Sequence, residues 1–239
     1  MREGVPIAPS LVATPLEPAS PVDRRVVFTS LLALALGGVA ALVAEALRAV
    51  IALVTNLAFY GRWSAAAASP SGNHLGWLVV LPPVAGGLVV GLMARYGSAA
   101  IRGHGIPEAM EQVLFNRSRI PARITWLKPL SAAIAIGTGG PFGAEGPIIA
   151  TGGALGSLVG QLVPVTAAER KVLLASGAAA GMAATFGTPV SAVLLAVEFL
   201  LFEFRARSII PVALASVAAA AVRISLRGAF AWQDRKSVV

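Results

Sequence analysis

The chain has no cysteine among its 239 residues, which excludes disulfide bonds and thiolate metal sites. Only two histidines occur, His74 and His104, and they lack the spacing of a metal-ligand pair, so we expect neither a metal nor a cofactor. Charged residues amount to only 13%, far fewer than in an ordinary soluble domain. Their formal net charge is +8, but no basic stripe with interleaved aromatic residues is present, which argues against a nucleic-acid partner.

Apolar residues take the place of the missing polar ones. They make up 56% of the chain, and the mean hydropathy is +0.79, which indicates a protein that crosses the membrane several times and is surrounded by lipid. Arginines stand between the apolar segments, as the positive-inside rule predicts for cytoplasmic loops. Residues 1–23 are proline-rich without a periodic apolar face, so we predict a disordered cytoplasmic tail. We expect a multi-pass protein of the cell membrane, namely the inner or plasma membrane of a prokaryote.

The apolar segments predict an all-α, polytopic membrane fold with about seven or eight helical pieces, several of them tilted or too short to span a bilayer. Pro82-Pro83 is expected to kink the second helix, and Gly187-Thr188-Pro189 to break a later one. Gly152, Gly156 and Gly160 recur every four residues, a spacing that lets helices pack closely. The predicted helices cover residues 26–59, 75–93, 107–115, 126–136, a segment after Glu145, 173–186, 190–204 and 208–222.

The end of the chain has no helical pattern. We expect residues 231–239 to be a truncated end, so that the natural protein continues. The last six residues, Asp234 to Val239, match the translation of a sequencing adapter, and we expect them to be foreign to the natural protein.

Glu145 is the most informative residue, because it places a carboxylate among glycines in an apolar sequence of membrane length. Its motif is Gly143-Ala144-Glu145-Gly146-Pro147, and a similar motif, Gly103-His104-Gly105-Ile106-Pro107, lies upstream. An acid inside the membrane costs roughly 2.5–3.5 kcal/mol on insertion scales, so it indicates a functional site. Both motifs have the glycine and proline of a helix start, where unpaired N–H groups and the helix dipole bind anions.

We therefore predict an anion site where the two helix N-termini converge. Glu145 is the predicted gate, since its carboxylate can occupy the same N–H groups as a permeating anion and can leave them when it is protonated. Glu108 is favoured as a partner of the helix dipole. His104 either caps its helix or adds a group whose charge changes near neutral pH. The candidate anion-binding residues are Gly103, His104, Gly105, Ile106, Pro107, Gly143, Ala144, Gly146 and Pro147.

The two motifs resemble the first and second selectivity motifs of the CLC family of chloride channels and chloride/proton exchangers, usually Gly-Ser-Gly-Ile-Pro and Gly-Lys/Arg-Glu-Gly-Pro. The likeness includes Lys128 and the Thr188-Pro189 break, and residues 24–230 are similar to the first of the family's two inverted halves. The resemblance implies an inorganic anion, chloride, as the transported ion and a gating role for Glu145. It also implies a homodimer of the full-length protein, formed partly by residues 190–204 and 208–222.

Three positions depart from the family pattern. His104 replaces the usual serine, and Ala144 replaces the usual cation beside Glu145, which should weaken the attraction of anions. Phe199 stands where exchangers of this kind have a proton-carrying glutamate. Glu198 is one position away, about 100° around a helix, and Glu203 is a further turn away. These two are the candidates for a proton path, but the pattern slightly favours channel-like conduction over proton-coupled exchange.

Two alternatives stay open. An unrelated secondary transporter would also have discontinuous helices and an acid near the bilayer midplane. The chain as it stands is also compatible with a half-pore fragment that has no activity. An intramembrane enzyme is not expected, because the sequence has neither His-Glu-x-x-His nor Gly-x-Ser-x-Gly.

Overall fold

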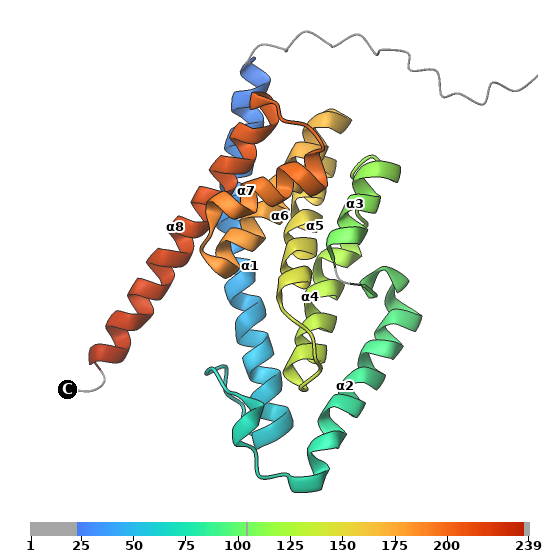
Figure 1. The fold of residues 1–239 in the computed structure, drawn as a ribbon, viewed down its shortest axis with the longest axis vertical. Coiled ribbons are helices and arrows are strands. Elements are labelled where there is room, and N and C mark those ends of the chain that lie inside the picture. Colours follow the sequence, from blue (N-terminus) through green and yellow to red (C-terminus); the bar gives the residue numbers. More distant parts are fainter. Residues whose placement is uncertain (1–22, 104, 237–239) are drawn as a thin grey trace, which may run out of the picture.

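The computed structural model describes residues 23–103 and 105–236, with side chains as far as Leu226. Every regular element in this part of the chain is a helix, which confirms the all-α prediction (Figure 1). Short 3₁₀ helices (Pro70–Gly72, Gly76–Val80, Ala99–Ile101) and π-helical turns (Met93–Gly97, Val197–Leu201) connect the α-helices. The α-helices are α1 (Arg24–Tyr60), α2 (Leu81–Leu92), α3 (Ile106–Phe115), α4 (Ala122–Gly137), α5 (Glu145–Leu162), α6 (Ala167–Phe186), α7 (Pro189–Ala196) and α8 (Ala206–Lys236).

Long and partial helices are combined in this fold. Within the described residues, three segments are long and apolar enough to cross a membrane: Arg24–Tyr60, Gly76–Gly97 and Ala206–Leu226. The 37 residues of α1 correspond to about 55 Å, more than the hydrocarbon core of about 30 Å, so α1 must tilt or extend past the interface. In contrast, α3 has 10 residues and α7 has 8, too few to span.

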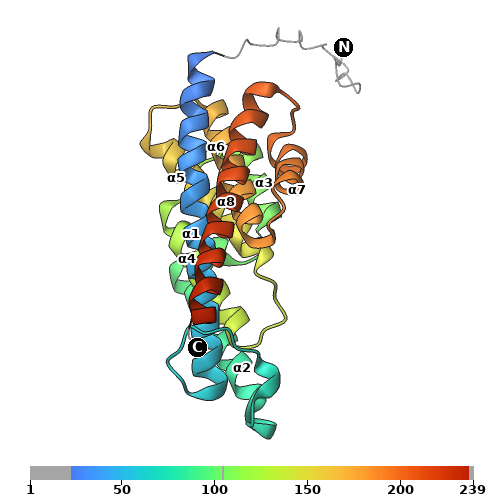
Figure 2. The ribbon, with the colours of Figure 1, turned by 90° about the vertical axis from the view of Figure 1, so that its left-hand side faces the viewer.

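The helices α5 and α6 lie side by side at the centre of the molecule. α1 and α8 pack against α6, and α4 packs against α5. Figures 1 and 2 show α1 and α8 alongside each other in the upper part of the view. α3 and α2 lie along the other edge in Figure 1, with α3 above α2, so the beginning of α3 is about midway along the molecule.

Small residues allow α5 and α6 to touch through their backbones. A Cβ atom on Gly152 would overlap the carbonyl group of Gly177, and a Cβ atom on Gly156 would overlap that of Leu173. Gly160 faces the aliphatic part of the Arg170 side chain. Gly152, Gly156 and Gly160 are all buried. The predicted glycine packing face is therefore confirmed, and it holds α5 in place with its first residue, Glu145, at the level of the site.

Gly156→Ala is expected to destabilise the fold by about 1–3 kcal/mol, because the new methyl group would push α5 away from the Leu173 carbonyl. Gly153→Ala is the matched control, since a Cβ at that buried position would lie 3.7 Å from its nearest neighbours, an ordinary contact. The free energy of unfolding in detergent should be measured for both variants. Equal costs would show that close contact between α5 and α6 is not what Gly156 provides.

The prolines and the start of α6 differ from their predicted places for local reasons. Pro82 and Pro83 do not kink a helix but stand in the first turn of α2, where their missing N–H groups cost nothing. α6 begins at Ala167 rather than Leu173, because Thr166 and Glu169 form a capping box. The Thr166 N–H donates to Glu169 Oε2 at 2.7 Å, and the Glu169 N–H donates to Thr166 Oγ1 at 3.2 Å.

The helices after the Gly187 break also differ from the prediction. α7 ends at Ala196 and passes into the π-helical turn, which stops where Phe202 adopts a left-handed φ of 53°. α8 continues past the predicted end at Val222 as far as Lys236. Of the proposed tail at residues 1–23, residues 1–22 lie outside the described residues and Asp23 is the N-cap of α1. The foreign origin of residues 234–239 stays a prediction.

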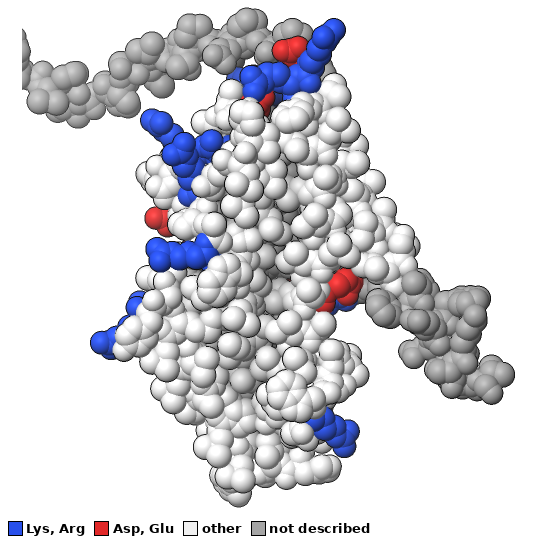
Figure 3. Space-filling model, turned by 180° about the vertical axis from the view of Figure 1, so that it is seen from behind, with Lys and Arg blue, Asp and Glu red and all other residues white. Residues whose placement is uncertain are grey.

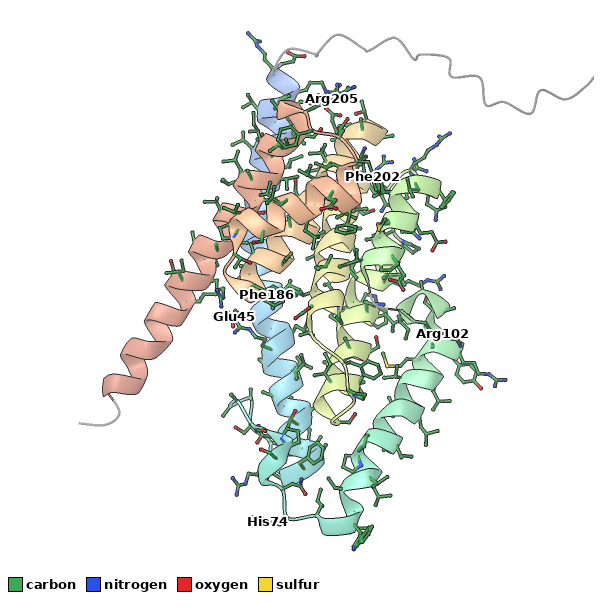
Figure 4. The ribbon with its side chains drawn as sticks, in the orientation of Figure 1. Glu45, His74, Arg102, Phe186, Phe202 and Arg205 are labelled. Carbon is green, nitrogen blue, oxygen red and sulfur yellow. The ribbon has the colours of Figure 1, made fainter. Side chains whose placement is uncertain are left out.

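Charged side chains gather at one end of the molecule. Arg25 Nε donates to Glu169 Oε1 at 2.9 Å, and Arg25 and Arg207 line the same small cavity there. Arg205 lies at this end in Figure 4. Figure 3 shows Lys and Arg side chains around the start of α1 and along one edge, with a wide, mostly uncharged surface elsewhere. By the positive-inside rule we expect this end in the cytoplasm, and the orientation stays a prediction.

Candidate functional site

Both sequence motifs contribute to one cavity of about 850 Å³. Gly103 and Ile106 come from the first motif, and Gly143, Glu145, Gly146 and Pro147 come from the second. Residues of α2, α4, α7 and the end of α6 complete the wall, and Figure 4 labels two of the lining residues, Arg102 and Phe186. The remaining lining residues are Val90, Ile101, Lys128, Ser131, Ala132, Ala135, Ile136, Pro141, Phe142, Ile149, Met182, Thr188 and Leu195.

The N-termini of α3 and α5 meet at this cavity. Gly105, at the N-cap of α3, has a φ of 103°, and a Cβ atom there would overlap the carbonyl oxygen of Gly146 in the first turn of α5. Only glycine fits such a contact in this backbone conformation. Pro107 and Pro147 occupy first turns, where the helix makes no use of their N–H groups. The predicted convergence of the two helix starts is thus present in the fold.

The α3 N-terminus is partly occupied by the chain's own acid. Glu108 Oε2 accepts the Gly105 N–H at 2.6 Å, and the Glu108 carboxylate lies where a Cβ on Gly103 would be. This is the helix-dipole role that the sequence favoured for Glu108. It leaves fewer free amides at α3 than at α5, whose first-turn N–H groups have no intrahelical partner.

Lys128 supplies a positive charge to the cavity wall. It belongs to α4, is only 3% exposed, and its Nζ donates to the carbonyl oxygens of Ile101 at 2.8 Å and Gly103 at 3.0 Å. These bonds satisfy a buried ammonium group and hold the segment that leads into the first motif. In the sequence, Lys128 stood out only through the family resemblance. Its signal was a cation in the middle of the helix Ala122–Gly137, whose other charged residue, Arg123, stands near the start.

Glu145 faces the cavity from the first position of α5. Its side chain is exposed, and it makes no hydrogen bond with a backbone N–H of the described residues. The sequence led us to expect the carboxylate on the amide cluster. The structure gives the carboxylate no hydrogen bond to the amides of the described residues, so the competition between carboxylate and anion stays a prediction.

The other motif residues differ in their placement. Gly143 lines the cavity, and a Cβ atom there would have no neighbour closer than 3.9 Å. Ala144, the N-cap of α5, is not one of the lining residues. Gly105 and Pro107 also stand outside the lining, the first because it packs against Gly146. His104 lies outside the described residues, so its two roles stay open.

Neither of the two candidate proton carriers lines the cavity. Glu203 belongs to the basic end of the molecule, where it accepts a hydrogen bond from the Ser208 hydroxyl at 2.6 Å and lies 3.7 Å from Arg205 Nε. Glu198 is exposed on the π-helical turn Val197–Leu201. A π turn has more residues per turn than an α-helix, so Glu198 is offset from Phe199 by slightly less than the roughly 100° of an α-helix.

Comparison with known proteins finds relatives that are named as chloride channels or chloride/proton exchangers. The sequence model of the voltage gated chloride channel family matches residues 86–234. A ClcB-like protein of Ralstonia nicotianae is 28% identical over 147 residues, which cover 60% of this chain and 34% of the relative. The H(+)/Cl(-) exchange transporter ClcA of Vibrio campbellii is 38% identical over 118 residues, 48% of this chain and 24% of the relative.

A solved structure of a slow cyanobacterial Cl⁻/H⁺ antiporter has the same fold, with a TM-score of 0.63 at 23% identity, covering 82% of this chain and 46% of that one. The chain thus spans less than half the length of each of these proteins. The family match, in contrast, covers more than half of this chain and includes both motifs. The chain therefore belongs to the CLC family, the voltage gated chloride channels.

Proposed function

We propose that this chain forms one half of a pathway that transports anions, chloride in the first instance, across the cell membrane. The observation that supports this most strongly is the meeting of two helix N-termini at one cavity, with Gly105 against Gly146 and Lys128 in the wall. Family membership supports the same function and makes the alternative of an unrelated secondary transporter wrong.

The site would replace part of an anion's hydration by fixed donors. Each helix dipole contributes about 0.3–1 kcal/mol when exposed and up to about 2 when partly buried, and a hydrogen bond to a charged group contributes about 1.5–3 kcal/mol. Several donors are needed, and the first turn of α5 and the remaining amides of α3 supply some of them. Lys128 adds a positive charge that is held by carbonyl groups and so cannot leave the wall.

Glu145 would act as the gate. Its carboxylate lines the cavity at the N-terminus of α5, within the same helix turn whose amides would hold the anion. When the carboxylate is charged it competes with the anion for these amides, and protonation removes the competition. The exposed position in this structure would correspond to a side chain that has left the amides.

Channel-like conduction is the mode that we propose. Phe199 cannot carry a proton, and neither Glu198 nor Glu203 lines the cavity. The relatives include an exchange transporter, so proton coupling is the second candidate, with Glu198 and Glu203 as its carriers. Simultaneous measurement of chloride and proton flux would separate the two modes: conduction alone moves no protons.

A complete pathway would need a second half of similar fold, since the chain spans less than half of its relatives. We therefore propose that the full-length protein, meaning this chain followed by such a half, is the transporting unit, that it forms a homodimer, and that it resides in the prokaryotic inner or plasma membrane. Chloride efflux from liposomes tests this. The full-length protein should release chloride and residues 1–239 alone should not. Robust, anion-selective efflux from residues 1–239 would contradict the half-pore proposal, and none from the full-length protein would contradict the transport proposal.

A further inference from the structure

The linker between α3 and α4, residues 116–121, contains two adjacent residues in an unfavourable backbone conformation. Arg117 has a φ of 49° and Ser118 a φ of 59°, in the left-handed region that residues other than glycine rarely adopt. Such residues cost about 1–3 kcal/mol each and persist only where the surrounding structure fixes them. The linker must therefore be held by specific contacts.

A single buried hydroxyl group provides the central contact. Ser157 of α5 donates to the Ser118 carbonyl at 2.6 Å and accepts the Ile120 N–H at 2.9 Å. Ser157 is 0% exposed and Ser118 is 1% exposed. Gln161, one turn further along α5, donates to the Ile120 carbonyl at 2.9 Å. Since these partners are cut off from water, loss of the hydroxyl would leave a carbonyl and an N–H unpaired.

Arg170 ties the same linker to α6. Its side chain is buried, its Nε donates to the Gly160 carbonyl at 2.9 Å, and its Nη1 lies 3.5 Å from the Arg117 carbonyl oxygen. The linker is thus held against the end of α5 and the beginning of α6, the two helices at the centre of the fold.

The linker in turn controls where α3 points. Ala109 is the one fully buried residue of α3, and Ile106, Met110 and Val113 are partly buried against the core. Leu114 and Phe115 at the end of the helix are exposed, so side-chain packing holds this end weakly. α5 contacts α3 at both ends: at Gly146 against Gly105, and at Ser157 against the linker. Because α3 has only 10 residues, contacts at both of its ends fix its direction. Without the contact between Ser157 and the linker, the end of α3 would be free to move.

We propose that Ser157 is a positioning residue for the first anion motif, acting through the linker and α3. For its transport readout this inference rests on the proposed function. By this proposal Ser157, in the C-terminal half of α5, helps to set the anion affinity at the N-terminus of the same helix.

Amide hydrogen exchange of residues 1–239 in detergent tests the positioning without transport. In Ser157→Ala the amides of α3 should exchange about tenfold faster, the effect of losing about 1.4 kcal/mol of hydrogen bonding, while the amides of α6 keep their rates. Ser176→Ala is the matched control, because Ser176 is equally buried but its hydroxyl bonds only the Val172 carbonyl of its own helix. Gln161→Ala, at an exposed position, takes the place of Ser157→Ala if that variant does not fold.

The full-length protein gives a second readout. Ser157→Ala should raise the chloride concentration at half-maximal flux about five- to tenfold while maximal flux per folded protein stays unchanged, which a loss of folded protein alone would not do. Unchanged α3 exchange in Ser157→Ala, or exchange equal to that in Ser176→Ala, would overturn the inference. If the unsubstituted full-length protein transported no anion, the proposed function would fail, and the exchange experiment would still decide whether Ser157 positions α3.

Discussion

Replacing Gly105 with alanine is expected to lower chloride flux through the full-length protein about tenfold or more. Gly105 has a φ of 103°, and its Cβ would overlap the carbonyl oxygen of Gly146. The variant must either rotate the backbone before α3 or move α3 away from α5, and each change misaligns the two helix N-termini. Backbone strain of this kind costs about 1–3 kcal/mol, and every 1.4 kcal/mol of lost anion binding is a factor of ten.

Gly143→Ala is the control for this substitution. Gly143 also lines the cavity and belongs to the second motif, but the nearest atom to a Cβ there, Glu145 Cγ, lies 3.9 Å away. Its flux should stay within about threefold of the unsubstituted protein, because no contact is lost and no strain is introduced. Initial efflux rates from liposomes of equal protein content compare the two. Normal flux in Gly105→Ala would show that the contact between the motifs is not needed.

The apolar segments of the sequence, and the Gly and Pro residues at their boundaries, were sufficient to predict the fold class and the two helix starts. The Gly and Pro residues of the motifs are local signals for helix N-termini, and the four-residue glycine spacing predicted a close-packing face on the helix that follows Glu145. These signals depend on a few neighbouring residues, so they can be recognised without knowledge of the tertiary structure. The cavity itself follows from them, because both starts approach it.

Other parts of the site depend on contacts between distant segments and could not be predicted in that way. Lys128 donates three hydrogen bonds to carbonyl oxygens of the segment before α3. These bonds require α4 to lie next to that segment, and nothing in the local sequence specifies this. The π-helical turn at Val197–Leu201 changes the register of Glu198, although the residues there also suit an α-helix. The bond from Ser157 to Ser118 joins residues 39 positions apart.

Glu145→Gln should have the other large effect. Glutamine has the shape of protonated glutamate but carries no charge, so it competes poorly with an anion for the amides of α5. At neutral pH we expect flux about tenfold higher than in the unsubstituted protein, since a charged hydrogen bond of about 1.5–3 kcal/mol no longer opposes the anion. Glu111→Gln is the control, because Glu111 is an exposed acid of α3 that does not line the cavity.

The sign of the pH dependence follows from the same competition. In the unsubstituted protein, lowering the pH protonates Glu145 and frees the amides, so flux should rise as pH falls. In Glu145→Gln the group no longer titrates, so flux should be high and nearly constant. Glu111→Gln should keep the pH dependence of the unsubstituted protein.

Chloride flux through the full-length protein, measured from acidic to alkaline pH with and without Glu145→Gln, tests the competition between carboxylate and anion most directly. We predict a flux that falls with rising pH in the unsubstituted protein and a high, pH-independent flux in the variant. Parallel pH profiles for the two proteins, or a variant with less flux than the unsubstituted protein at every pH, would contradict the role of Glu145 as gate.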